Sequence, residues 1–181
     1  MRWLLLLVLG LGCAHVPSAK VEHYTGEVIL SIPGSKKPFG RLPTVARITR
    51  DPEAGLIMEE MVLPGRTAND HAREIVVNYE HTDEFGVFKV HDNLKSFHGT
   101  VTFVGTPWHW EEWRMSYVMK DKARVKGLAL KEDGIIKTRK IIYNAKGKPI
   151  FVQREVLNPA SSSEYKKLRQ QIVQRKLKYK K

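Results

Sequence analysis

The sequence predicts an all-β fold, a meandering antiparallel β-barrel or strongly curved half-barrel of about ten strands with a C-terminal α-helix. Three observations predict it. Between residues 21 and 157 apolar and polar residues alternate with the period of a strand, and none of this segment has a helical period. Turn residues interrupt the alternation at intervals of roughly 8–14 residues. The connections are short, which favours serial hairpins in a barrel over a two-sheet sandwich, and closure would remove the unpaired edges.

The first half of the segment supplies six expected strands. Tyr24, Gly26, Val28, Leu30 and Ile32 share one face of the first, and a Pro- and Gly-rich stretch over 33–38 ends it. The strands that follow are expected over 44–50, 56–63, 75–79, 85–91 and 97–103. Residues 51–55, Asp-Pro-Glu-Ala-Gly, form the loop between the second and the third.

The second half supplies four more strands, expected over 108–119, 123–131, 135–143 and 149–157. An Asp-Gly step at 133–134 and a Lys-Gly step at 146–147 separate the last three, and both are hairpin signals. Residues 158–160, Asn-Pro-Ala, are expected to end the last strand.

The pattern then changes to that of a helix. Ser161 and Glu164 have the spacing of a capping box, in which each side chain bonds the other residue's backbone N–H. Tyr165, Leu168 and Ile172 follow at helical spacing. These residues predict a helix from about 162 to the mid-170s whose narrow apolar stripe docks on the barrel or on a lipid surface.

The N-terminus has the features of an export signal. Met1-Arg2-Trp3 is a short positive region, and the apolar run Leu4 to Leu11 follows it. This run is too short for a membrane span, which needs roughly 20 residues. The only cysteine of the chain, Cys13, stands just after it, so the chain cannot form an internal disulfide.

The segment Leu9-Gly10-Leu11-Gly12-Cys13 resembles the lipobox of bacterial lipoproteins. Gly12 fits that pattern, whereas Gly10 stands where the family prefers a large aliphatic residue. The resemblance implies that Cys13 is the lipid-attachment site, that cleavage precedes it, and that acyl chains on this residue anchor the protein in a membrane. Ala14 in the next position implies an outer-membrane location facing the periplasm.

We therefore divide the chain into a lipoprotein signal peptide (1–12), a lipidated tether (13–20), the antiparallel β-barrel domain (21–160) and a basic C-terminal helix and tail (161–181). The net charge of the chain is +12. Most of this excess lies in 161–181, which holds eight Lys and Arg against one Glu. Residues 166–181 are either a solvated terminus or a surface for anionic lipid head groups. Nucleic acid is not an expected partner, because an exported protein meets little of it.

Residues suited to catalysis or metal binding lack the spacing that such sites need. His71, His81 and His91 recur at ten-residue intervals, not at the close spacing of zinc ligands. The adjacent pairs Glu59-Glu60 and Glu111-Glu112 should each point to opposite faces of their strand. The chain also has no nucleophile elbow, Walker A loop or dinucleotide motif. We expect no catalytic residues, no metal and no cofactor.

The richest local feature is the segment 108–119, which holds three of the four tryptophans. It is either a core strand with a bulge that changes the register between Trp110 and Trp113, or the wall of an incompletely filled barrel. In the second case its Trp and Met side chains suit an apolar ligand, and Arg114 is a candidate polar contact. The candidate ligand-binding residues are Phe103, Trp108, Trp110, Trp113, Arg114, Met115 and Tyr117.

In outline the body over about 22–175 resembles the calycins, the lipocalin-like group of meandering barrels, although the Gly-x-Trp signature is replaced by Gly26-Glu27-Val28. The resemblance implies a non-enzymatic cell-envelope lipoprotein that binds or carries a hydrophobic or amphipathic small molecule. The alternative is a structural or assembly lipoprotein with a filled barrel that binds another envelope protein, and a hydrolase or metal-dependent enzyme is the third. A cavity above roughly 300 Å³ would favour the carrier.

Overall fold

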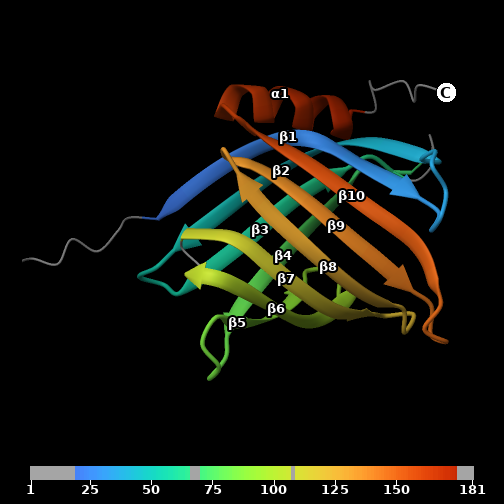
Figure 1. Cartoon of the computed structure of the whole chain (residues 1–181). Helices are drawn as coiled ribbons and strands as arrows, with labels where there is room; N and C mark the ends of the chain where they lie inside the picture. Colours follow the sequence, from blue (N-terminus) through green and yellow to red (C-terminus); the bar gives the residue numbers. More distant parts are fainter. Residues whose placement is uncertain (1–18, 66–69, 107–108, 175–181) are drawn as a thin grey trace, which may run out of the picture.

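The computed structural model describes residues 19–65, 70–106 and 109–174, which form a closed barrel of ten antiparallel strands and one helix (Figure 1). The strands are β1 (Lys20–Ser31), β2 (Gly40–Asp51), β3 (Leu56–Leu63), β4 (Arg73–His81), β5 (Val87–Asp92), β6 (Phe97–Thr106), β7 (His109–Met119), β8 (Arg124–Glu132), β9 (Ile135–Tyr143) and β10 (Pro149–Ala160). The helix, α1, spans Ser162–Val173. The predicted all-β class is confirmed, and the barrel is closed rather than half-open.

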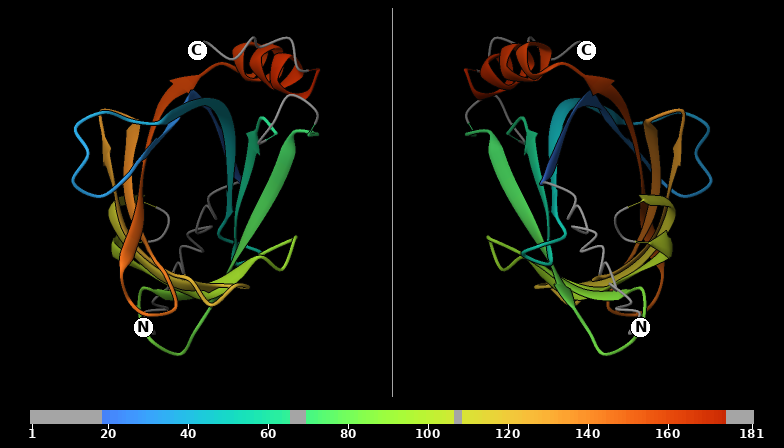
Figure 2. Two further views of the ribbon diagram at one scale, coloured as in Figure 1. Left: turned by 90° about the vertical axis from the view of Figure 1, so that its right-hand side faces the viewer. Right: turned by 90° about the vertical axis from the view of Figure 1, so that its left-hand side faces the viewer.

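Each strand pairs with its neighbours in the chain, and β1 closes the ring by pairing with β10 (Figure 2). In this last pair Gly26 lies opposite Leu157 and Tyr24 opposite Pro159. Gly26 is required there, because an added Cβ would lie 1.9 Å from the carbonyl oxygen of Val156. Closure leaves neither terminal strand with an open edge, which protects the sheet from pairing with other chains.

The barrel has two ends, and the chain enters and leaves at one of them. We call this the proximal end; β1 begins there at Lys20 and β10 finishes there at Ala160. The other, distal end carries the β5–β6, β7–β8 and β9–β10 turns. Side chains alternate between interior and exterior along every strand, so the core residues recur at every second position.

The proximal and middle parts of the interior are filled by the main hydrophobic core. Aromatic rings dominate it: Phe103 lies 5.2 Å from Phe88 and 5.8 Å from Trp113 between ring centroids, both in edge-to-face geometry. Ile57, Ile136 and Leu157 pack in the same core. A smaller cluster of Val28, Met61 and Leu63 lines the interior where β1 and β3 approach the distal end.

Helix α1 lies outside the barrel and crosses β1, β2 and β3 (Figures 1 and 2). Its N-terminus has the predicted capping box, with Glu164 N–H donating to Ser161 Oγ and Ser161 N–H donating to the Glu164 carboxylate. Tyr165 and Ile172 are buried against Val45 and Val62 of the outer wall. The apolar stripe therefore docks on the barrel. No helix of the described ranges is long and apolar enough to cross a membrane.

Several strands are longer than predicted, among them β2, β4 and β6, and three other boundaries have an identifiable local cause. β1 stops at Ser31, so Ile32 lies outside it and is exposed. β5 begins at Val87 rather than at 85, because residues 82–86 turn the chain with Gly86 at a φ of 73°, and this leaves Phe85 outside the strand and 87% exposed. β10 continues through Pro159 to Ala160, because β1 extends far enough to pair with both.

Candidate functional site

The inner face of β7 carries three of the predicted ligand-binding residues. Trp113, Met115 and Tyr117 alternate along it and point into the barrel, with Trp113 and Met115 buried. A register shift occurs where Val104 pairs with Glu112 and Gly105 with Trp110, so the predicted bulge is confirmed. Phe103, opposite Trp113 on β6, is also buried, but it belongs to the core packed against Trp113 rather than to the cavity described below.

The other predicted residues do not join this group. Arg114 points outward, with a side chain that is 71% exposed and paired with Glu112 at 2.9 Å between Nε and Oε1. It is therefore not the polar contact of the interior, since neighbouring residues of a strand face opposite sides. The side chain of Trp110, the whole of Trp108, Cys13 and the tail from 175 lie outside the described residues.

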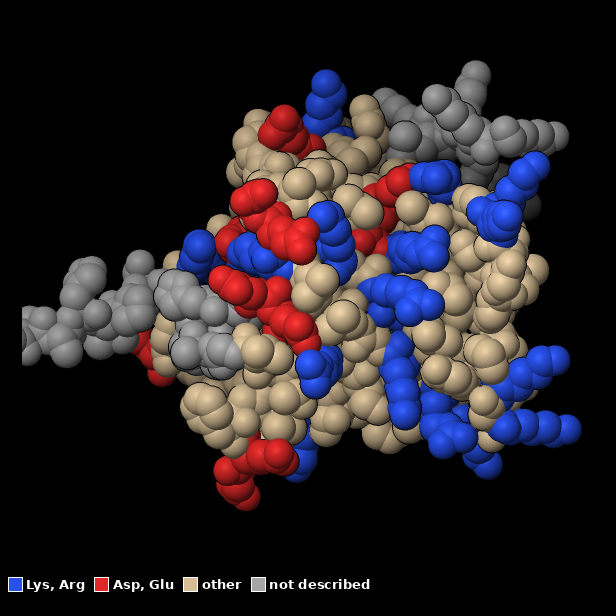
Figure 3. Space-filling model, viewed as in Figure 1, with Lys and Arg blue, Asp and Glu red and all other residues tan. Residues whose placement is uncertain are grey.

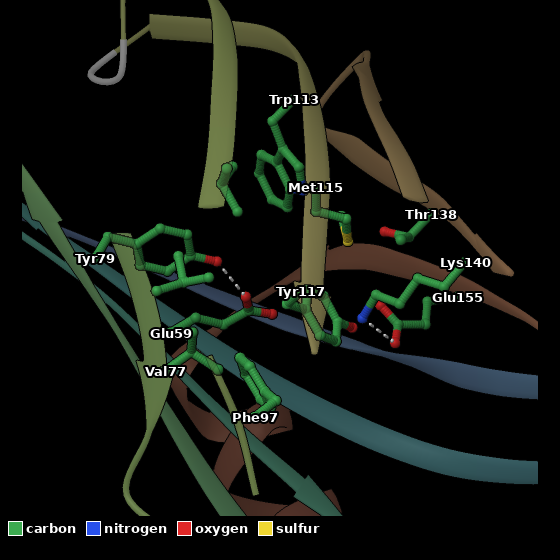
Figure 4. Close-up of a pocket in the computed structure, with 12 residues that line it drawn as sticks. Glu59, Val77, Tyr79, Phe97, Trp113, Met115, Tyr117, Thr138, Lys140 and Glu155 are labelled. Atoms are coloured by element: carbon green, nitrogen blue, oxygen red, sulfur yellow. Dashed lines mark hydrogen bonds and ion pairs between the residues drawn. The ribbon is translucent and has the colours of Figure 1, made fainter. Parts of the chain in front are cut away.

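A cavity of about 50 Å³ lies in the interior (Figure 4). It adjoins the main core, which shares Trp113 and Met115 with its wall, and it extends toward the distal end at Phe97 and Tyr117. Apolar side chains form most of its wall, and several polar side chains converge on it. The lining residues are Glu59, Val77, Tyr79, Val90, Phe97, Val101, Trp113, Met115, Tyr117, Thr138, Lys140 and Glu155. This volume holds a few water molecules and is well below the 300–1,000 Å³ of drug-sized pockets.

Glu59 is one of the two carboxylates on the cavity, and β3 points it inward. Tyr79 on β4 donates a hydrogen bond from its hydroxyl to Glu59 Oε2 at 3.0 Å (Figure 4). Burial raises the pKa of Glu59, and the nearby carboxylate of Glu155 adds to this, while Lys140 and Tyr79 act in the opposite direction. Burial and the Glu59 carboxylate likewise raise the pKa of the Tyr79 phenol. Glu59 therefore resists ionisation more strongly than an exposed Glu does.

The second carboxylate belongs to an ion pair across β9 and β10. Lys140 Nζ lies 2.9 Å from Glu155 Oε1 (Figure 4), and Glu155 is only 3% exposed. The amide of Gln153 donates to the same oxygen. Burial acts to lower the pKa of Lys140, but Glu155, Tyr117 and Glu59 outweigh it, so the ammonium stays charged. Lys140 is thus the cation of the cavity, in place of the predicted Arg114.

A second ionic group lies in the interior nearer the proximal end. Glu22 bonds Arg50, which is 3% exposed, and its Oε1 lies 3.1 Å from Lys131 Nζ. Burial acts to raise the pKa of Glu22, but the two cations outweigh it and hold it at about 2. Arg50 also acts on Glu59, so its charge reaches the cavity. The interior therefore holds carboxylates and cations in nearly equal measure, all inside a largely apolar barrel.

Sequence reasoning found part of this site. It separated Glu59 from Glu60, and the structure confirms it, because Glu60 lies outside and pairs with Arg47. It missed Lys140, Glu155 and Thr138, which β9 and β10 aim into the barrel. A signal was present, since these polar residues stand at inward positions of strands whose other inward residues, Ile136 and Leu157, are apolar.

The charge of the outer wall is also unevenly distributed. Lys and Arg side chains gather over β8, β9 and β10, on the right-hand part of the face in Figure 3. The exposed ones on these strands are Arg124, Lys126, Lys137, Arg139 and Arg154. Basicity is therefore not a property of the C-terminal segment alone, as the sequence count suggested, because folding places these residues on one face.

Among the described residues no group of three or more His, Cys, Asp or Glu side chains is arranged to hold a metal ion. His91 lies opposite His98 across β5 and β6 and 3.6 Å from Glu80, at the barrel exterior. No protein-family model matches the chain. No curated protein matches it either.

Proposed function

We propose that this protein is a cell-envelope lipoprotein that binds a small amphipathic molecule inside its barrel. The polar part of the ligand lies against Glu59, Tyr79 and Lys140, and its apolar part against Trp113 and Met115. The observation that carries the proposal is the cavity, in which ionisable groups and aromatic rings converge in a buried space. Polar groups that converge on an apolar wall, with shifted pKa values among them, are features of small-molecule sites.

The cost of the buried polar groups supports a role in binding. Transfer of a carboxylate or ammonium from water into a protein interior costs several kcal/mol even in a pair. Apolar residues of similar volume at Lys140, Glu155 and Glu59 would stabilise the barrel at least as well. These residues are therefore not needed for the stability of the barrel, but they can bind a ligand that has hydrogen-bonding groups.

The volume of the cavity restricts the ligand. About 50 Å³ admits a small polar group, not an acyl chain. The ring of Phe97 at the start of β6 lies 4.7 Å from that of Tyr117 near the end of β7, both toward the distal end. A longer ligand therefore enters from the distal end and displaces these rings, whereas the packed core blocks the proximal end.

The alternative is a structural or assembly lipoprotein whose interior is filled and whose outer surface binds another envelope protein. The small volume of the cavity favours this alternative over a carrier of fatty acids. The two functions differ in one observable, the presence of a bound small molecule in the protein from its own envelope.

The experiment is native mass spectrometry of the Cys13→Ser protein purified from its envelope, repeated under denaturing conditions. An added mass in the native spectrum alone supports the binding function and gives the ligand class. Glu59→Gln and Lys140→Met should lower the fraction of protein that carries the added mass. Glu60→Gln changes the neighbouring carboxylate on the outer wall and should leave that fraction unchanged. A bare protein that takes up no small amphipathic probe would favour the filled barrel.

Membrane attachment needs a separate test. Acyl chains on Cys13 would anchor the domain, because each buried methylene contributes about 0.8 kcal/mol. Cys13→Ser should move the protein from the membrane fraction into the soluble fraction. A wild-type protein without acyl mass would contradict the anchor and leave the binding function of the barrel untouched.

A further inference from the structure

The exposed charged residues on the outer surface of three adjacent strands are almost all basic. We call the exposed residues Arg124, Lys126, Lys137, Arg139 and Arg154 the basic face. They lie on β8, β9 and β10, which are neighbours in the ring, so the face is about 10 Å wide across the strands. Glu132, at the end of β8, is paired with Lys137 at 2.8 Å. Neighbouring charges of the face reinforce one another, because adjacent strands lie about 5 Å apart, less than the Debye length of about 8 Å at physiological salt.

The centre of the basic face is a pair of arginines held directly opposite each other. In the β9–β10 register Arg139 pairs with Arg154, which places their Cβ atoms about 5 Å apart on the same side of the sheet. Like charges in this relationship repel and reduce stability. Neither residue has an ion pair in the described part of the chain, and neither do Arg124 and Lys126.

Two other arginines lie in the same row of outward-facing residues, which runs across the strands from β2 to β7. Ile29 of β1 lies between Arg154 and Arg41, and Leu128 of β8 lies between Arg139 and Arg114. Arg41 is paired with Glu27 at 2.7 Å and Arg114 with Glu112 at 2.9 Å. The outer arginines of the row are thus neutralised by neighbouring carboxylates, and the two central ones are left for an external anion.

Apolar side chains lie between the cations. Leu128 is 38% exposed beside Arg139, and Val156 and Ile141 are partly exposed on the neighbouring positions of β10 and β9. Further exposed lysines, Lys146 and Lys148, extend the charge along the β9–β10 turn at the distal end. A surface that mixes guanidinium and ammonium groups with aliphatic side chains fits the head-group region of a membrane, where both kinds of contact are available.

We propose that the basic face docks on an anionic lipid surface, with Arg139 and Arg154 binding the phosphate groups of lipid heads. Guanidinium groups bind phosphate through parallel hydrogen bonds, and the anion would also relieve the repulsion between the two. The site does not depend on the cavity. The choice of a membrane over an acidic protein rests on the anchor proposed at Cys13, since a tether from 13 to 20 spans at most roughly 25 Å and keeps the barrel close to the lipid.

The test measures binding of the full-length Cys13→Ser protein to vesicles, so that acylation plays no part. Vesicles of phosphatidylcholine with about a third phosphatidylglycerol should bind it, and pure phosphatidylcholine should not. The double variant Arg139→Gln/Arg154→Gln should lower the partition coefficient about thirtyfold at low salt, since each basic residue near the surface contributes about fivefold. Wild-type binding should also fall when the salt rises from roughly 0.05 M to 0.5 M.

A matched control separates this face from net charge. Lys89→Gln/Lys95→Gln removes the same charge from β5 and the turn after it, on the far side of the ring, and should change binding less than fivefold. Deletion of 175–181 in each protein tests whether the tail accounts for the binding. Equal binding to both kinds of vesicle, or equal loss in the two double variants, would overturn the proposal and direct the search to an acidic protein. Loss confined to the Arg139 and Arg154 variant supports it.

Discussion

Lys140 of β9 and Glu155 of β10 form an ion pair of 2.9 Å inside the barrel wall, at the edge of the cavity. Their preceding neighbours, Arg139 and Arg154, face each other on the outside of the same two strands. One pair of strands therefore carries a satisfied ion pair on its inner face and a repulsive pair on its outer face. The alternation of side chains along a strand makes both arrangements possible with two adjacent residues on each strand.

The inner pair should show strong coupling. Lys140→Met leaves Glu155 buried without its cation and should cost about 3–5 kcal/mol in free energy of unfolding. Lys140→Met combined with Glu155→Leu should recover most of that loss, because no buried charge remains. Urea unfolding of the two single variants and the double variant measures the coupling energy. Additive losses would show that the pair does not act as a unit.

Substitution in the outer pair, Arg139 and Arg154, should stabilise the protein, whereas a single substitution in the inner pair destabilises it. Arg139→Gln removes the repulsion with Arg154 and should raise the free energy of unfolding by about 0.2–1 kcal/mol. Arg114→Gln, two strands away in the same row, breaks an exposed ion pair with Glu112 and should lower it by at most about 1 kcal/mol. Thermal unfolding of the two variants at low salt makes the comparison. A destabilised Arg139→Gln would contradict the repulsion.

Glu22 should make the stability of the barrel depend on acid pH. Its pKa of about 2 in the folded state lies below the ordinary 4.5, so its contribution is present above pH 4.5 and is lost as the pH falls toward 2. At neutral pH this contribution is about 3 kcal/mol. The difference in unfolding free energy between the wild type and Glu22→Gln should therefore shrink through this window. A constant difference would mean that folding does not lower the pKa of Glu22.

Glu59 should affect the pH dependence of stability in the opposite direction to Glu22. Burial raises its folded pKa above 4.5, so its contribution to stability is greatest below pH 4.5 and is lost as the pH rises through the raised value. Glu59→Gln keeps an acceptor for the Tyr79 hydroxyl and removes this loss. The variant should gain stability relative to the wild type as the pH increases, measured by urea midpoints between about pH 4 and 9. Glu60→Gln, on the outer wall, should not reproduce the trend.

The docking of α1 should contribute measurably to stability. Ile172 is 1% exposed against Val45 and Val62, and truncation to Ala should cost about 2–4 kcal/mol. Ser161→Ala removes the side chain of the capping box and should cost about 1 kcal/mol. Helix-specific amide exchange and thermal unfolding distinguish local release of α1 from loss of the barrel. If Ile172→Ala is as stable as the wild type, the docking of α1 does not contribute to the stability of the barrel.

Local sequence determined the strands, the turns between them and the capped helix. The period-2 alternation, the Gly and Pro positions and the spacing from Ser161 to Ile172 are properties of short segments, and each predicts its element because local backbone preferences depend mainly on neighbouring residues. The same rule separated Glu59 from Glu60 without a structure, since a strand must send adjacent side chains to opposite faces.

Tertiary structure decided everything that depends on which strands are neighbours and in what register. The closure of β1 on β10, the contact of Glu59 with Tyr79 and the pair of Lys140 with Glu155 join residues that no local pattern relates. Closure also gathered the basic residues of β8, β9 and β10 on one face, although the sequence count had assigned the charge to the C-terminal segment. The physical reason is that pairing energy and the alternation of inward and outward positions fix the partners of a side chain across strands, whereas composition counts only its presence.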